Sequence, residues 1–177
     1  MPREHAGPVV LPAGDGVVTL RAFVAADRPV VLAGRDEQWQ RWLGPGSPDP
    51  SPTACIEVGG VVVGWIDADL TPPWLHPGEA NIGYSVFAVH RGNGYAARAM
   101  RLLATELVER GVRRALLVVD ARNRASVGVA RDAGAHLLEL RSIPEVPSSD
   151  VYALELAPGA SDSDQPHHTT SARPPDA

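Results

Sequence analysis

The sequence predicts an α/β (α+β) fold in which helices pack on a mixed, mostly antiparallel sheet. Three observations lead to this fold class. In the first half of the chain, short runs rich in β-branched residues are separated by glycine and proline turns. In the second half, apolar strands alternate with amphipathic helical stretches. The 177 residues, 44% of them hydrophobic and 21% charged, suffice for one domain with a sizeable core.

The first third of the chain predicts one strand followed by helices. The run VVTLRAF at 17–23 alternates and is rich in branched side chains, which indicates a strand. Asp27 stands before an arginine, a proline and an apolar run, as at a helix start. The stretch DEQWQRWL at 36–43 predicts a helix with Trp39 and Trp42 on one face, and we expect both tryptophans to belong to the core.

An antiparallel meander follows. The runs ACIEV at 54–58 and VVVGWIDADL at 61–70 flank the dipeptide Gly59-Gly60, which supplies the positive φ angles of a tight hairpin turn. After a proline-rich loop, a further strand is predicted from Glu79 to Val89.

The second half predicts helices and strands in alternation. Alanine, leucine and methionine recur at helical spacing after the glycines at 92 and 94, and glycines follow both predicted helices. The expected elements are a helix closed by Gly111, a buried strand at 115–119, a helix from the cap Asn123 to about Ala133, and strands at 136–141 and 150–156. We therefore expect an irregular segment at 1–16, one domain at 17–156 and a disordered tail at 157–177.

Composition excludes several classes of function. All 16 residues counted as Lys+Arg are arginine, so a lysine-containing P-loop and lysine Schiff-base chemistry are ruled out. The single cysteine, Cys55, and the spacing of the six histidines predict no metal site. A net charge of -5 argues against a nucleic-acid partner and suits a cationic acceptor. No apolar run approaches the ~18 residues of a membrane span, so we expect a cytoplasmic protein without a membrane partner.

The stretch VFAVHRGNGYAARAM at 86–100 predicts an anion site. A strand runs into Gly92 and Gly94 and then into a helix, whose first N–H groups have no intrahelical partner and carry the positive end of the helix dipole. Glycines let a phosphate approach the backbone, and Arg91 adds a permanent charge. A pyrophosphate-containing cofactor fits this description.

Two such cofactors compete for the site. The letters GNGYAA also satisfy G-x-G-x-x-A, and Asp120 ends the following strand near the position of a ribose-binding acid in dinucleotide-binding folds. That fold needs further βαβ units, however, and only one helix and two strands follow Asp120. A nicotinamide dinucleotide is therefore the second choice.

The sequence resembles the GNAT superfamily of N-acetyltransferases, and within it the RimJ/RimL-like group of ribosomal-protein alanine acetyltransferases. RGNGYA is similar to the family's pyrophosphate signature R/Q-x-x-G-x-G/A. NIGYSV at 81–86 and NRASVGVARDAGA at 123–135 are similar to the strand before that signature and to the group's N-x-x-S segment with its helix. The resemblance covers about 79–141.

The resemblance implies the acyl-CoA N-acyltransferase fold, with helices on both faces of a sheet that splays open after the Glu79–Val89 strand. It implies acetyl-CoA as co-substrate and no metal. The pantetheine arm would bind at the strand end, the pyrophosphate at the glycine loop and the thioester beside the second helix. The implied cofactor-binding residues are Phe87, Ala88, Val89, Arg91, Gly92, Asn93, Gly94, Tyr95, Ala96, Asn123 and Ser126.

The implied reaction is direct attack of a primary amine on the acetyl thioester. We expect Glu79 to neutralise the amine through a water positioned by Asn81, which shares its strand face. Many relatives carry a thiolate-protonating tyrosine seven positions after the Asn, where this chain has Ala130. Ser126 inherits that role, with helix capping as its alternative.

The sequence leaves the acceptor open between a peptide N-terminus and a small-molecule amine. An acyl-CoA-binding sensor or partner protein without turnover is the alternative to an enzyme. The oligomeric state is also open, with a homodimer as one candidate.

Overall fold

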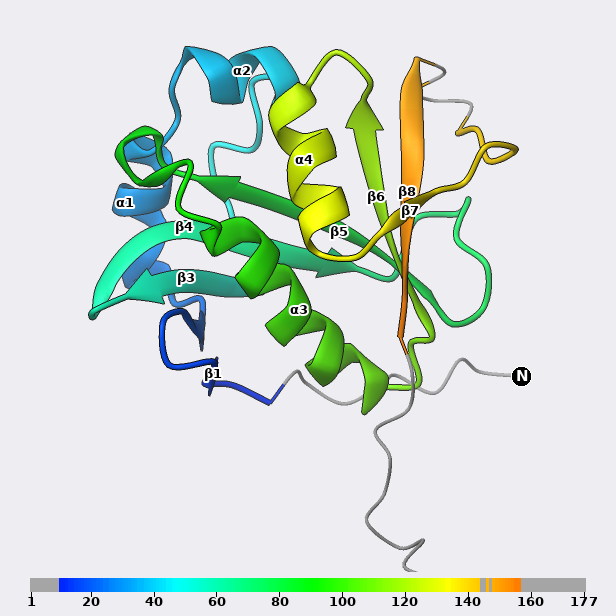
Figure 1. The fold of residues 1–177 in the computed structure, drawn as a ribbon. Helices are drawn as coiled ribbons and strands as arrows, with labels where there is room; N and C mark the ends of the chain where they lie inside the picture. The colour runs from blue at the N-terminus through cyan, green and yellow to red at the C-terminus, as the bar shows by residue number, and fades with distance from the viewer. Residues whose placement is uncertain (1–9, 144–145, 147, 157–177) are drawn as a thin grey trace, which may run out of the picture.

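The computed structural model describes residues 10–143, 146 and 148–156 (Figure 1). Within these residues, eight strands form one sheet in the order β1-β2-β3-β4-β5-β6-β8-β7. Neighbouring strands are antiparallel except β5 and β6, which are parallel, so the predicted mixed, mostly antiparallel sheet is confirmed. The strands are β1 (Ala13–Gly14), β2 (Thr19–Ala22), β3 (Ala54–Val58), β4 (Val61–Asp69), β5 (Glu79–Val86), β6 (Arg114–Asp120), β7 (His136–Leu137) and β8 (Ser149–Glu155).

Turn chemistry explains the first half of the sheet. Gly59 and Gly60 have φ angles of 57° and 80°, and they close the predicted hairpin between β3 and β4. The sheet also reaches into the segment expected to be irregular, because the Asp15 carboxylate accepts hydrogen bonds from the amides of Val17 and Val18, both at 2.9 Å. This turn pairs β1 with β2. Most of the rest of the 1–16 segment lies outside the described residues. The predicted tail at 157–177 lies wholly outside them.

The helices follow the predicted order, with shorter bounds. They are α1 (Arg28–Ala33), preceded by the 3₁₀ turn η1 (Ala25–Asp27), then α2 (Glu37–Leu43), α3 (Tyr95–Val108) and α4 (Arg124–Asp132), while η2 (Ala88–His90) follows β5. Asn123 caps α4 as predicted, since its side chain accepts a hydrogen bond from the Ser126 amide at 3.2 Å. Gly111 closes α3 as predicted, although the regular helix already ends at Val108: with a φ of 76°, Gly111 donates its amide to the Val108 carbonyl at 2.9 Å, and the Val112 amide donates to the Leu107 carbonyl at 3.1 Å.

Helices α3 and α4 lie side by side in front of the sheet (Figure 1). The side chains of Ala80, Ile82 and Val86 on β5 belong to the core cluster that contains the buried face of α3. Phe87, the next residue in the alternation, instead lies against Gly34 at the end of α1. Among the described residues, no helix is both long and apolar enough to cross a membrane.

The strand predicted at 136–141 is wrong in its length. Only His136 and Leu137 form β7, and the Leu138 amide adds one more hydrogen bond to β8 at the Val151 carbonyl, 2.8 Å away. The chain then turns, and Arg141 reaches back across the sheet to Glu79 at 2.9 Å.

Strands β5 and β6 separate along their length, which creates the gap for the site. β4 pairs with β5 from Asn81 to Val86, whereas β6 pairs with β5 only over Glu79–Asn81. Beyond Asn81, the edge of β5 that faces β6 therefore has no strand partner within the described ranges. The predicted splay of the sheet is confirmed.

Candidate functional site

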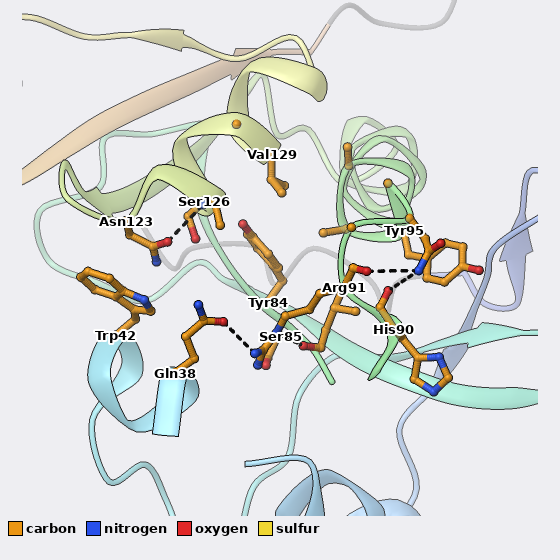
Figure 2. A pocket seen from close by; sticks show the side chains of 18 of the residues that line it. Gln38, Trp42, Tyr84, Ser85, His90, Arg91, Tyr95, Asn123, Ser126 and Val129 are labelled. Carbon is orange, nitrogen blue, oxygen red and sulfur yellow. Dashed lines mark hydrogen bonds between the residues drawn. The ribbon is translucent and has the colours of Figure 1, made fainter. Parts of the chain in front are cut away.

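A cavity of about 400 Å³ occupies the gap between β5 and β6. Its wall combines the end of β5, the loop at 91–94 and the first turns of α3 and α4, and α2 covers one side (Figure 2). The cavity is lined by these predicted site residues: Arg91, Gly92, Asn93, Gly94, Tyr95, Ala96, Asn123 and Ser126. Five other predicted site residues are not in its wall: Glu79, Asn81, Phe87, Ala88 and Val89.

The loop before α3 offers unshared backbone donors to the cavity. Gly92 and Gly94 have φ angles of 78° and 74°, a conformation that other residues rarely adopt. Gly94 is the N-cap of α3 and has no side chain to cap it. Among the described residues, nothing accepts a hydrogen bond from the backbone amides of residues 92–97. These amides and the helix dipole together form a positive site for an anion.

The space above this loop is open. A Cβ atom added to Gly92 or Gly94 would meet no described atom within 4 Å. The Asn93 side chain points back into the loop and donates to the carbonyls of His90 and Arg91, at 3.0 and 3.2 Å. The Asn93 hydrogen bonds thus stabilise the loop internally, and the outer surface of the loop is accessible to a ligand.

Arg91 lines the cavity, but its guanidinium is already engaged. It donates to both carboxylate oxygens of Asp36, at 2.7 and 2.9 Å, to the Gln38 side chain at 2.7 Å and to the Val86 carbonyl at 2.8 Å. Arg91 therefore ties α2, whose N-cap is Asp36, to the loop before α3. The Arg91 guanidinium also holds the pKa of Asp36 at about 2, well below the ordinary 3.8.

We expect Arg91→Met to lower the unfolding free energy by about 1 kcal/mol, because it removes a bidentate, partly exposed ion pair. The lowered pKa of Asp36 means that this contribution is present above pH 4 and fades as the pH falls towards 2. Urea unfolding between pH 7 and pH 2.5 measures it. Arg98→Met is the control, since among the described side chains Arg98 makes one hydrogen bond, to Asp15 at 2.8 Å, and an equal loss in both variants would contradict the anchoring role.

The free edge of β5 provides a second set of backbone groups. The Phe87 amide donates to the Val63 carbonyl of β4 at 2.9 Å, so by alternation the amides of Tyr84 and Val86 face the gap. The strand residues in the cavity wall are Tyr84, Ser85 and Val86, whereas the prediction for an extended ligand lies at Phe87–Val89. The difference arises because η2 begins at Ala88 and turns that segment away from the strand direction.

Asn123 and Ser126 lie together at the first turn of α4, as predicted (Figure 2). The Tyr84 side chain reaches the same place from β5, and its hydroxyl oxygen is buried with no hydrogen-bond partner among the described residues. Ala130, at the position where relatives carry a tyrosine, is completely buried in the core. The hydroxyl groups at this end of the cavity therefore come from Tyr84, Ser85 and Ser126.

Glu79 lies at the far, paired end of β5, inside an ion-pair cluster. Its carboxylate accepts hydrogen bonds from the His76 amide and Arg141, both at 2.9 Å, and lies 3.5 Å from Arg114. Burial raises the pKa of Glu79, but the His76 amide and the Arg141 guanidinium outweigh it and hold the pKa below the ordinary 4.5. Asn81, two residues along, also lies outside the cavity wall. The base role of this pair stays a prediction.

Some lining residues were not singled out as site residues from the sequence. Trp39 is buried as expected, yet it lines the cavity together with Trp42 and Gln38 of α2. The helical periodicity marks one apolar face, yet it cannot show that this face covers the gap as well as the core. Tyr84 could have been predicted as a site residue from the sequence, since it lies inside the motif NIGYSV.

Three other chemistries find little support in the described residues. No group of His, Cys, Asp and Glu there could hold a metal ion. Burial, the largest effect, and nearby Asp27 raise the pKa of the Cys55 thiol to about 12, so it is no nucleophile at neutral pH. Asp120, the candidate ribose acid, does not line the cavity, and its carboxylate accepts hydrogen bonds from its neighbour Arg122 at 2.9 and 2.6 Å.

Residues 21–135 match the family described as "Acetyltransferase (GNAT) family". No curated protein matches the chain. Among solved structures, an acetyltransferase from Agrobacterium tumefaciens str. C58 is similar in fold, with 22% identity and a TM-score of 0.67 over 86% of this chain and 99% of the other. A GNAT-family acetyltransferase from Bacillus anthracis has 17% identity and a TM-score of 0.65 over 82% and 98%.

An aminoglycoside acetyltransferase, AAC(6')-Ib, is also similar in fold. It has been solved with Ribostamycin and Coenzyme A and with Parmomycin and AcetylCoA, and in both cases the identity is 16% and the TM-score 0.68 over 83% of this chain and 99% of the other.

Proposed function

The chain belongs to the acetyltransferase (GNAT) family, and from this premise we propose that it transfers the acetyl group of acetyl-CoA to a primary amine by direct attack in a ternary complex. The observation that carries the proposal is the cradle of unshared amides at residues 92–97, open to a cavity that continues between β5 and β6. A pyrophosphate and a flexible amide-bearing arm need these two features side by side.

We assign the pyrophosphate to the amides of residues 92–97 and the pantetheine arm to the free edge of β5 at Tyr84–Val86. An extended arm with amide groups can add to a strand edge in the manner of a further strand. In this arrangement Asn123 and Ser126 lie beside the thioester. Arg91 supports the site by holding α2 and the loop, since its own hydrogen bonds are taken by Asp36, Gln38 and Val86.

The acceptor amine would reach the thioester from the side of α2. Tyr84 and Ser85 both line the cavity, and by alternation their side chains point to opposite faces of the sheet. Cofactor and acceptor can therefore approach from opposite sides. Trp42, Gln38 and Ser85 form the wall on the acceptor side.

The residues assigned to the acceptor side, Trp42, Gln38 and Ser85, include no carboxylate or imidazole, and this favours a weakly basic amine. At pH 7, neutralising a lysine amine with a pKa near 10.4 costs about 4.6 kcal/mol, against about 1 to 1.4 kcal/mol for an α-amine near 7.7 to 8.0. A peptide N-terminus, as in the RimJ/RimL-like group, is therefore our first choice. An aminoglycoside amine is the second, because AAC(6')-Ib is similar in fold.

A binding protein without turnover is the competing function. Two observations favour it. The Glu79 carboxylate is paired with Arg141 outside the cavity, and the methyl side chain of Ala130 cannot donate a proton. A nicotinamide dinucleotide is less well supported, since Asp120 is outside the cavity and engaged with Arg122.

We expect acetyl-CoA and CoA, but not NAD, to raise the melting temperature of the protein. At a ligand concentration 100 times the Kd, the stabilisation is about 2.7 kcal/mol. We also expect release of CoA when acetyl-CoA is supplied with an alanine-initiated peptide or with ribostamycin. A thermal shift without transfer to any amine would support the binding protein, and a shift with NAD alone would overturn the proposed cofactor.

A further inference from the structure

The Tyr84 hydroxyl is an unexplained group at the reactive end of the cavity. Its oxygen is buried and has no hydrogen-bond partner among the described residues, although a buried polar group is normally paired. Tyr84 lines the cavity, and its hydroxyl points towards Ser126 at the first turn of α4 (Figure 2). An unpaired hydroxyl on a residue of the cavity wall is placed to pair with a ligand that enters the cavity.

The position of Tyr84 along β5 identifies that partner. Tyr84 lies three residues beyond Asn81, where pairing with β6 ends, and therefore inside the open gap. Under the proposed function, on which this step rests, the thioester lies there, beside Asn123 and Ser126. We infer that Tyr84 donates a proton to the sulfur of CoA as the thiolate leaves.

The step balances in atoms and charge. The amine nitrogen attacks the thioester carbonyl carbon and the C–N bond forms. The C–S bond then breaks, its electron pair goes to sulfur, and the Tyr84 O–H proton follows to give the free thiol of CoA. The acetylated nitrogen must lose a proton, and this proton returns to the Tyr84 phenolate through Ser126 or solvent water.

Acidity favours the phenol over the serine hydroxyl. A tyrosine, with a reference pKa near 10, lies about 1.5 units above a thiol near 8.5. An alcohol hydroxyl, comparable to water at about 15.7, lies about 7 units above it. Burial raises the pKa of Tyr84, and the nearby Ser126 hydroxyl offsets part of this, although the two groups do not meet with hydrogen-bond geometry. Tyr84 is thus protonated at neutral pH.

Tyr84→Phe tests the inference with little risk to the fold, because the lost hydroxyl has no hydrogen-bond partner within residues 10–143, 146 and 148–156. We expect its melting temperature without ligand to be equal to or above that of the unmodified protein. We expect kcat to fall on the order of 100-fold, with the KM for acetyl-CoA nearly unchanged. Tyr152→Phe is the matched control, since Tyr152 is a buried tyrosine on β8 outside the cavity wall, and it should keep kcat.

A second readout is independent of turnover. The thiol of bound CoA can be titrated by the ultraviolet absorbance of its thiolate. A hydrogen bond from Tyr84 to the thiolate should lower the apparent pKa of that thiol, so Tyr84→Phe should raise it by about one unit.

The outcomes separate this inference from the proposed function. If the unmodified protein binds CoA but transfers no acetyl group, the proposed function fails, and the thiol titration still decides on Tyr84. If transfer occurs and Tyr84→Phe keeps its kcat and the same thiol pKa while Ser126→Ala loses activity, the inference is overturned and Ser126 is the donor. A lower melting temperature of Tyr84→Phe without ligand would show that the hydroxyl is structural, which also overturns it.

Discussion

Gly94→Glu is expected to abolish the rise in melting temperature that acetyl-CoA produces. The new carboxylate would lie at the N-cap of α3, where the helix dipole and the free amides of residues 92–97 favour a negative charge. It would occupy the position that we assign to the pyrophosphate. Losing about two charge-assisted hydrogen bonds weakens binding on the order of 100-fold. Thermal shift or calorimetry with acetyl-CoA measures the effect.

A control for this variant is available just after the C-terminal end of α3. Gly111 has a φ of 76°, close to the 74° of Gly94, and a Cβ at either position would meet nothing within 4 Å. Gly111→Glu therefore carries a similar backbone strain and the same charge at the opposite end of the helix, away from the cavity. It should keep the acetyl-CoA response. If Gly94→Glu binds acetyl-CoA as tightly as Gly111→Glu, the amide cradle is not the pyrophosphate site.

Glu79→Gln is expected to cost about 3 kcal/mol of unfolding free energy. The Glu79 side chain is only 4% exposed and faces Arg141 at 2.9 Å, so removing its charge leaves a largely buried guanidinium without its counter-ion. Because the pKa of Glu79 is lowered, its contribution is present above the unfolded pKa near 4.5 and is lost as the pH falls through the lower folded pKa. Urea unfolding at pH 7 and pH 3 tests both statements.

Glu155→Gln is the matched control, and the same variants test the predicted base role. Glu155 accepts from Arg114 at 2.7 Å but is 52% exposed, so its loss should cost less than about 1 kcal/mol. If Glu79 acts only in the ion-pair cluster, Glu79→Gln should keep kcat under conditions where it is folded. A kcat that falls on the order of 100-fold in the folded variant would instead support the base role.

Local interactions determined much of what the sequence predicts. The glycine pair at 59 and 60, the cap at Asn123 and the glycines at 92 and 94 act through their own backbone angles and nearest neighbours, so their structures could be predicted from short stretches. The splayed sheet and the family were predicted from motifs of similar length, such as RGNGYA at 91–96. Boundaries were less certain, as the short β7 shows, because strand length depends on the partner strand.

The sequence by itself therefore determined the order of elements and the free amides at the start of α3, because these depend on residues within a few positions of one another. Only the tertiary structure decided which polar side chains pair with one another. Arg91 meets Asp36, 55 positions away, and Glu79 meets Arg141, 62 positions away. Tyr84, in contrast, reaches α4, and its hydroxyl pairs with no other group in the part of the chain that the structure describes. Such pairings depend on how distant segments pack, and no local pattern in the chain records them.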